Sequence, residues 1–451
     1  MKKFLFMAVA LLTFATTANA QKVNTSAELK KLEKADANLA NPKKNTKAAT
    51  WNAHGKAYAD AYILPTKSLI REIPVATLQM TAGMPEDQFQ VEFMGAPMIA
   101  LHYEYVDVYV DQTYMIKGWN QLKSIKEGLA ESAIESFKKA YELDPNLGPK
   151  INANASALAN ALAQQGEMLS FNGKTAEAAY CFELAYEAQA IAPESAADAA
   201  NLYNAGMLYA MAGSTVTGEE AVTLFKKCEV LLNKALANNY TDESGNIYYY
   251  LFHSYYAQKD ADRELYLGKA KEALLTGIKL FPKNNIILDG LMSFYTAEEG
   301  VGDPAELVSL VESSLKEDPT NYDLWFGRGR VFFALKNYDE CVTSFKKCAE
   351  LRPNEFEPQY YVGSFLIEKV NAEIEAINND LNLSYEEKNA KTAEINVTYA
   401  DAIPWLERAH EFNPTDKATL DLLKQLCFRL RDMDGMMDKY NKYKALLDQI
   451  Q

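Results

Sequence analysis

Residues 322–353, with the sequence YDLWFGRGRVFFALKNYDECVTSFKKCAELRP, have the pattern of two short helices joined by a turn. The two predicted helices carry landmark residues at the spacings W-x3-G-x2-F and C-x3-F-x2-C, followed by a proline: Trp325, Gly329, Phe332, Cys341, Phe345, Cys348 and Pro353. The small landmarks let the two helix backbones approach, and the large ones fill the space between them. The proline has no N–H with which to continue the second helix. One hairpin cannot bury its apolar face alone, so the pattern predicts neighbours of the same kind.

The same spacing recurs along the chain. Trp51 and Gly55 repeat the pattern of the first helix, and Ala133 and Phe137 repeat that of the second helix much further on. Further hairpins are predicted around these landmarks: Gly166 with Phe182, Gly206 with Phe225, Tyr248 with Leu274, Leu288 with Leu310, and Gly363 with Leu406. The stretch at 322–353 is therefore one member of a series.

These landmarks resemble the pattern of the tetratricopeptide repeat (TPR) family, W-x2-L-G-x2-Y…A-x3-F…P. Arg328 stands where leucine is usual, and Cys341 stands where alanine is usual. The resemblance spans about residues 46–450. It implies an all-α fold, a superhelical solenoid of about seven helix hairpins. Two hairpins depart from the pattern, because a small α+β insertion divides the first and the helices of another are extended.

The pattern and its departures divide the chain into seven segments. We expect a signal peptide at 1–20, an N-terminal arm at 21–45, the first helix of the first repeat at 46–63, an α+β insertion at 64–113, the TPR array at 114–355, a repeat with extended helices at 356–415 and a C-terminal capping hairpin at 416–451. In the extended repeat, residues 370–397 are charged and predict two helices that are simply longer than usual, with a turn at 382–384.

The insertion differs in composition from the rest of the chain. Residues 75–88 predict a short helix that ends near Gly83, and the alternating and β-branched residues after it predict a three-stranded antiparallel sheet. The order of helix, Gly-Met-Pro and strands is similar to the small α+β fold of the lipoprotein of the outer-membrane β-barrel assembly machine. A solenoid does not require such a module. It either docks a partner or caps the apolar edge of the first repeat, and both alternatives stay open.

Residues 1–20 have the features of a secretory signal peptide. Lys2 and Lys3 precede an apolar run, and an A-x-A cleavage site ends at Ala20. The first cysteine is Cys181, far from that site, which argues against a lipid anchor. No later apolar run is long enough for a membrane span. We therefore expect an exported protein, in the periplasm first of all, with an outer-membrane-associated or extracellular location as the alternatives.

The 451-residue chain is acidic. Without Lys2 and Lys3, 44 basic side chains remain against 61 acidic ones, a net charge of −17. Such a charge argues against nucleic acid and anionic membrane surfaces as partners. Apolar residues make up 48% of the chain, enough for a large core, and the scarcity of glycine and proline favours helices.

The sequence shows no constellation typical of an enzyme. Its histidines, His54, His102, His253 and His410, have no catalytic or metal-binding partner at a recognisable spacing. It has no phosphate-binding loop and no nucleophile elbow. Its cysteines form no CxxC pair, and we expect them to be small core residues. The sequence therefore predicts no enzymatic activity, no metal and no cofactor.

The TPR resemblance implies a function in binding. In TPR proteins the first helices of the hairpins line a concave groove that holds an extended peptide or a partner helix. The resemblance places the following residues in this groove: Asn201, Asn204, Tyr249, Phe252, Tyr256, Phe326, Arg330, Phe333, Tyr360 and Ser364. The amide of Asn204 suits a peptide backbone, and Arg330 suits a carboxylate. For each aromatic residue, core packing between repeats is the alternative.

These features predict a non-enzymatic scaffold for protein partners in the cell envelope, in assembly or in secretion. The alternative is a glycan-binding TPR protein of the outer-membrane uptake type, because 11% of the residues are aromatic. Glycan-binding proteins of that type carry a lipidated cysteine and long loop insertions, and this sequence has neither. The sequence identifies neither the protein partner nor the oligomeric state.

Overall fold

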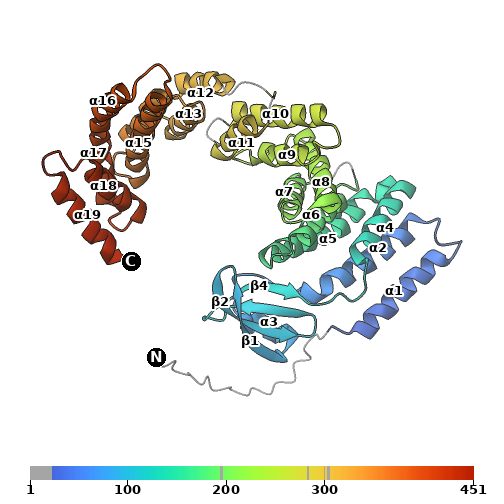
Figure 1. The fold of residues 1–451 in the computed structure, drawn as a ribbon. Helices are drawn as coiled ribbons and strands as arrows, with labels where there is room; N and C mark the ends of the chain where they lie inside the picture. Colours follow the sequence, from blue (N-terminus) through green and yellow to red (C-terminus); the bar gives the residue numbers. More distant parts are fainter. Residues whose placement is uncertain (1–22, 193–196, 282–283, 299, 302–304, 451) are drawn as a thin grey trace, which may run out of the picture. The chain divides into compact units, whose positions relative to one another are not determined.

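A computed structural model describes residues 23–192, 197–281, 284–298, 300–301 and 305–450. The predicted signal peptide at 1–20 lies outside these residues. The chain divides into two compact units, unit 1 (Met1–Tyr240) and unit 2 (Thr241–Gln451). Both units consist mainly of paired helices, and unit 1 also contains a β-sheet (Figure 1).

Unit 1 is a series of antiparallel helix pairs. Its helices are α1 (Thr25–Ala40), α2 (Ala48–Ile63), α3 (Val75–Ala82), α4 (Leu129–Leu143), α5 (Gly148–Phe171), α6 (Thr175–Gln189), α7 (Ala200–Gly213) and α8 (Gly218–Ala237). Helix α2 packs against α4, α5 against α6, and α7 against α8. The α2–α4 pair joins two helices that the whole α+β segment separates in the sequence. The first hairpin is therefore divided, as the landmark residues indicated.

Glycines on the first helix of a pair let the second helix approach. A Cβ atom on Gly55 would lie 2.7 Å from the ring of Phe137, and one on Gly166 would lie 2.9 Å from the ring of Phe182. Any larger residue would push the aromatic ring or the helix away. The spacing of the landmark residues therefore reflects a close contact between helices.

The third helix pair has a different register from the predicted one. The sequence predicted Phe225 as the large landmark of α8. In the structure Leu232 faces Gly206, and Phe225 packs against Gly213 at the end of α7. Phe225 and Leu232 are about two helical turns apart on the same face of α8, so the residue spacing alone did not distinguish them.

The segment between α2 and α4 folds as a four-stranded antiparallel sheet in the order β1-β2-β3-β4. The strands are β1 (Asp87–Phe93), β2 (Ala96–Tyr103), β3 (Val106–Val110) and β4 (Ile116–Gln121). The prediction of three strands is wrong, and the sheet continues past residue 113. The Asp111 carboxylate accepts hydrogen bonds from the N–H groups of Thr113 and Met115. This turn reverses the chain and brings β4 against β3.

Helices α3 and α5 hold the sheet in place. Leu78 of α3 packs in one cluster with Val108 of β3. Just after α5, the Asn172 side chain donates to the Trp119 carbonyl over 3.1 Å and accepts from the Tyr109 hydroxyl over 3.2 Å. The sheet is therefore anchored to the second helix pair as well as covalently continuous with the first.

Unit 2 continues with paired helices. They are α9 (Asn246–Tyr256), α10 (Arg263–Leu280), α11 (Asn285–Ala297), α12 (Ala305–Glu317), α13 (Tyr322–Ala334), α14 (Tyr338–Leu351), α15 (Phe356–Asn379), α16 (Tyr385–Asn396), α17 (Ile403–Phe412), α18 (Lys417–Arg429) and α19 (Met436–Ile450). The first helices of successive hairpins are neighbours, because α11 contacts both α9 and α13. Here too glycine faces a large residue, as a Cβ atom on Gly363 of α15 would lie 2.6 Å from Leu406 of α17.

The extended repeat has one continuous long helix rather than two. Helix α15 runs for 24 residues, as expected from its added length. Its partner is divided into α16, a 3-10 turn at Val397–Ala402, and α17. Pro404 in the first turn of α17 has no N–H for the helical hydrogen-bond pattern, which explains the break. The prediction of a second uninterrupted helix is wrong.

The five cysteines are all buried and form no disulfide, which agrees with their predicted place in the core. Among the residues that the structure describes, no helix combines the length and the apolar character needed to cross a bilayer.

We predict that Gly329→Ala destabilises unit 2 by about 1–3 kcal/mol. The new methyl group would lie 2.6 Å from the ring of Phe345, a distance that forces the two helices apart. The matched control is Gly268→Ala in α10, where a Cβ atom would meet nothing within 4 Å. That change should stabilise unit 2 by up to about 1 kcal/mol, because alanine has a higher helix propensity than glycine. Urea unfolding followed by circular dichroism measures both, and equal effects would contradict the prediction.

Candidate functional site

The residues predicted to line a groove lie in both units. Asn201 and Asn204 are on α7 in unit 1, and the others are on α9, α13 and α15 in unit 2. Asn201 is buried, and its side chain donates to Gln189 over 3.2 Å, so it takes part in packing between helices. Asn204 is half-buried and forms no hydrogen bond through its side chain to any other residue that the structure describes.

Two of the predicted aromatic residues join neighbouring hairpins. Phe252 is buried, and its ring meets that of Phe294 edge-on at 5.8 Å. The ring of Phe326 lies 5.4 Å from that of Phe345 and 5.4 Å from that of Tyr361. These contacts belong to the core between repeats, which was the alternative reading for aromatic residues at these positions.

Tyr256 takes part in a network of charges around the buried carboxylate of Glu298. Its hydroxyl donates to the Glu298 carboxylate over 2.6 Å, Lys259 approaches the same carboxylate at 2.5 Å, and Arg263 also pairs with it. Glu298 follows the end of α11 and is only 6% exposed. The hydrogen bonds from Lys259 and Tyr256 lower the pKa of Glu298 to about 2. The network fixes α11 to the end of α9.

A row of half-exposed side chains follows the first helices of unit 2. Tyr249 on α9 lies beside Asp289 on α11, and Asp289 forms an ion pair with Arg330 on α13. Arg330 in turn lies near Tyr361 on α15, whose ring meets that of Tyr360 in a T-shaped contact at 5.9 Å. Burial raises the pKa of Tyr249, and Asp289 adds to this effect. Sequence reasoning missed Asp289, because α11 lacks the strong landmarks of its neighbours.

Phe333 and Ser364 complete the set of predicted residues. Phe333 is 39% exposed, and its ring lies 4.8 Å from that of Phe365 on α15. The Ser364 hydroxyl oxygen is buried and has no hydrogen-bond partner in the described part of the chain. Tyr249, Arg330, Phe333 and Tyr360 therefore remain accessible to a ligand, whereas Phe252 and Phe326 serve packing.

Asp36, His54 and Ser136 meet in unit 1 and have the composition of a catalytic triad. His54 Nδ1 lies 2.8 Å from Ser136 Oγ, and His54 Nε2 lies 3.0 Å from Asp36 Oδ1. Ser136 is 2% exposed, and its hydroxyl also lies 2.7 Å from the carbonyl of Ser132. A substrate cannot reach this oxygen while α2 and α4 are packed together. We infer that the network holds α1 on the first hairpin.

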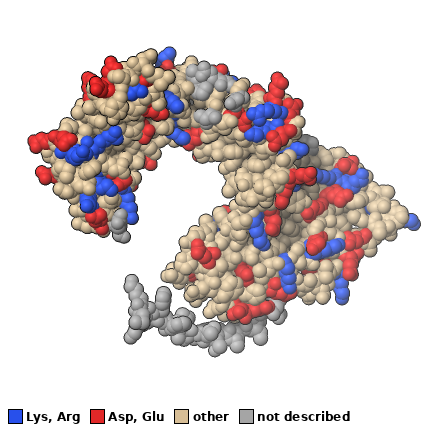
Figure 2. All heavy atoms as spheres, viewed as in Figure 1, with Lys and Arg blue, Asp and Glu red and all other residues tan. Residues whose placement is uncertain are grey.

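The other ionisable groups in the described part of the chain give no second candidate for chemistry. His102 pairs with Asp107 at 2.7 Å across two strands, and His253 packs against Tyr249, where burial lowers its pKa. No cluster of three or more metal-ligand side chains occurs in the ranges that the structure describes. Acidic and basic side chains are interspersed over the face shown in Figure 2, without a basic patch of the kind that binds nucleic acid.

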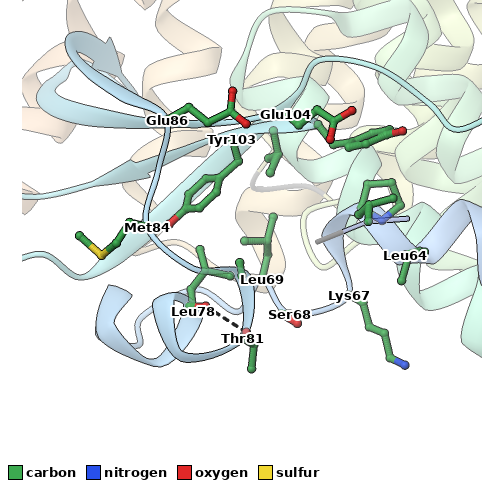
Figure 3. Close-up of a pocket in the computed structure, with 15 residues that line it drawn as sticks. Leu64, Lys67, Ser68, Leu69, Leu78, Thr81, Met84, Glu86, Tyr103 and Glu104 are labelled. Carbon is green, nitrogen blue, oxygen red and sulfur yellow. Dashed lines mark hydrogen bonds between the residues drawn. The ribbon is translucent and has the colours of Figure 1, made fainter. Parts of the chain in front are cut away.

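The α+β module borders a small, partly open pocket between α3, the segment after α2 and the β2–β3 hairpin, with both apolar and charged side chains in its lining (Figure 3). Leu69 and Leu78 form part of its wall, and the Tyr103 hydroxyl donates to the Gly83 carbonyl over 3.3 Å. Its volume is about 120 Å³. This is well below the roughly 300–1,000 Å³ of typical small-molecule sites, so we assign no ligand to it.

We predict that Glu298→Gln destabilises unit 2 by roughly 1.5–3 kcal/mol at neutral pH, the contribution typical of hydrogen bonds to a charged group. The pKa of Glu298 is lowered from 4.5 to about 2 in the folded chain, so the carboxylate stabilises the fold fully above pH 4.5 and loses this effect as the pH falls toward 2. The difference between wild type and variant should shrink over the same window.

Urea unfolding at several pH values in that window measures this difference in free energy. Glu350→Gln is the control, because its ion pair with Lys347 lies on the surface and should contribute little. A difference between wild type and Glu298→Gln that does not change with pH would contradict the assignment.

The tetratricopeptide repeat family matches the sequence twice, at residues 322–355 and at residues 124–147. The first match covers α13 and α14. The second covers α4, the helix that completes the divided first hairpin. Comparison with curated proteins gives no match.

Several solved structures are similar to the chain. A MamA structure, "MamA MSR-1 C2", has 18% identity, covers 48% of this chain and 97% of its own, and gives a TM-score of 0.26. Yeast Tom70 has 15% identity, covers 93% of this chain and 82% of its own, and gives a TM-score of 0.33. YrrB, described as a TPR protein with an unusual peptide-binding site, has 18% identity. It covers 49% of this chain and 94% of its own, and gives a TM-score of 0.26. All three TM-scores are below 0.5.

The two family matches fall on different helix pairs, and glycine faces a large residue between the paired helices of both units. The fold class predicted from the sequence is confirmed. Repeats of this family generally form non-enzymatic scaffolds for protein–protein interaction. The chain therefore contains tetratricopeptide repeats at these two places.

Proposed function

We propose that this TPR protein is a scaffold of the cell envelope, active in assembly or secretion, that binds an extended peptide or a partner helix along the first helices of unit 2. The observation that supports this site is the row from Tyr249 through Asp289 and Arg330 to Tyr360. Four successive hairpins contribute to it, one side chain after another. Rings at both ends suit apolar side chains, and the central charges suit polar groups of a peptide.

The ion pair at the centre of the row is suited to exchange its partners. The side chains of Arg330 and Asp289 are 38% and 47% exposed, so both remain within reach of a ligand. An incoming carboxylate can take both N–H groups of the guanidinium fork. Burial raises the pKa of Asp289 although Arg330 opposes the shift, so a second cation would stabilise this carboxylate further.

The proposed location outside the cytoplasm rests on Lys2, Lys3, the apolar run after them and the A-x-A site at Ala20. The cysteines are compatible with an oxidising compartment. Burial raises the pKa of Cys341 and of Cys348 to about 12, which keeps both thiols protonated and unreactive.

We predict that Arg330→Glu reduces the recovery of partner proteins at least about tenfold in a pull-down from envelope extract, because it puts two carboxylates together at the centre of the row. The control is Lys347→Glu on α14, the second helix of the same hairpin, which makes the same change of charge elsewhere. Quantitative mass spectrometry of the captured proteins compares the three baits.

Thermal unfolding must first show that both variants are folded. An identical set of partners for the wild type and Arg330→Glu would contradict the proposed site. Binding to a glycan array that disappears in Arg330→Glu would instead favour the glycan-binding alternative.

A further inference from the structure

Strand β1 is an open edge of the sheet in unit 1. In the order β1-β2-β3-β4 it has a hydrogen-bonded neighbour on one side only, and residues 87–90 are exposed. It is seven residues long and contains no proline, lysine or bulge, the devices that commonly protect an edge. The opposite edge differs. There the Trp119 carbonyl accepts a bond from Asn172, and Met115 forms a bridge with Pro74.

The register determines which backbone groups of β1 are free. Glu92 lies opposite Pro97 of β2. Proline has no N–H, so this pair cannot exchange two hydrogen bonds. Bonded and non-bonded pairs alternate along an antiparallel ladder, so Gln90 and Gln88 also occupy non-bonded positions. The N–H and C=O groups of these three β1 residues therefore point away from the sheet. In agreement, the N–H of Gln88 donates to the Asp87 carboxylate over 2.7 Å.

The side chains give this edge a chemical preference. Phe89 and Val91 lie on one face of β1, and Phe89 is 46% exposed. The charged residues of the edge are all acidic and exposed: Glu86, Asp87 and Glu92. None of the three forms an ion pair within the part of the chain that the structure describes. The edge therefore combines free backbone groups, an apolar centre and uncompensated negative charge at both ends.

We propose that β1 binds an extended basic peptide segment of a partner protein as a fifth, antiparallel strand of the sheet. This site is separate from the groove of unit 2 and does not depend on it. The outward N–H and C=O groups of Glu92 and Gln90, together with the C=O group of Gln88, provide the hydrogen bonds, as in other cases of strand addition. The unpaired carboxylates select a segment with lysine or arginine near both ends.

The register also defines the sequence pattern of the ligand. Read from its N-terminus, the incoming strand lies opposite Glu92, Val91, Gln90, Phe89, Gln88 and Asp87 in turn. Basic residues belong opposite the two acids, and apolar residues belong opposite Val91 and Phe89, where cross-strand pairs of apolar side chains are favourable. The peptide Lys-Val-Thr-Val-Thr-Lys meets these requirements.

Two peptides of identical composition test the backbone register. In one, the first threonine is N-methylated, which removes the N–H that would donate to the Gln90 carbonyl. In the other, the second valine is N-methylated. The N–H group of this valine would point away from β1. With the full chain and fluorescent peptides, anisotropy should show at least about tenfold weaker binding for the first peptide only, since one hydrogen bond is worth roughly that factor. Equal affinities, or no binding of the unmethylated peptide, would overturn the proposal.

Variants of the protein test the same site. Gln90→Pro removes an outward N–H and keeps the β1–β2 bonds, so it should abolish binding, whereas Gln90→Thr should retain it. Circular dichroism confirms that both are folded.

Asp87→Lys should weaken binding of the basic peptide and strengthen that of Glu-Val-Thr-Val-Thr-Glu, and the opposite result would contradict the charge preference. Lys347→Glu, which lies outside both proposed sites, should bind the peptide like the wild type. If light scattering shows a dimer of the wild type that Gln90→Pro dissociates, then β1 binds a second copy of the chain. That result would overturn the proposal.

Discussion

The fold depends on how closely the paired helices approach each other. In five of the hairpins that the structure describes, a glycine on the first helix leaves room for a large side chain of the second, as Gly55 does for Phe137 and Gly329 for Phe345. Added carbon at either glycine would clash with a buried ring. Because each hairpin buries only part of its surface, this contact matters for the whole series of repeats.

The sequence predicted the parts of the fold that depend on local spacing and missed those that depend on distant contacts. The pattern around Gly329 and the long helix after Phe356 follow from residue order alone. The choice of Leu232 over Phe225 depends on where α8 lies along α7, and the fourth strand depends on the turn at Asp111. Asp289, in the candidate site, was missed because α11 lacks the landmarks that would have aligned it with Arg330 on the next hairpin.

The α+β module links two adjacent hairpins. It divides the first hairpin in sequence, while Asn172 at the end of α5 binds the sheet through Trp119 and Tyr109. This anchoring agrees with a cap, and the exposed edge at β1 agrees with a docking surface, so the two alternatives are compatible. The proposed surfaces also differ in chemistry, because β1 offers backbone groups and the row in unit 2 offers side chains.

The divided first hairpin requires that α2 and α4 form one repeat through the contact of Gly55 with Phe137. A double-mutant cycle with Gly55→Ala and Phe137→Leu tests it in the free energy of unfolding. The smaller leucine leaves space for the new methyl group, so the double variant should be more stable than the sum of the single effects by about 1 kcal/mol or more. Additivity within about 0.5 kcal/mol would contradict the account.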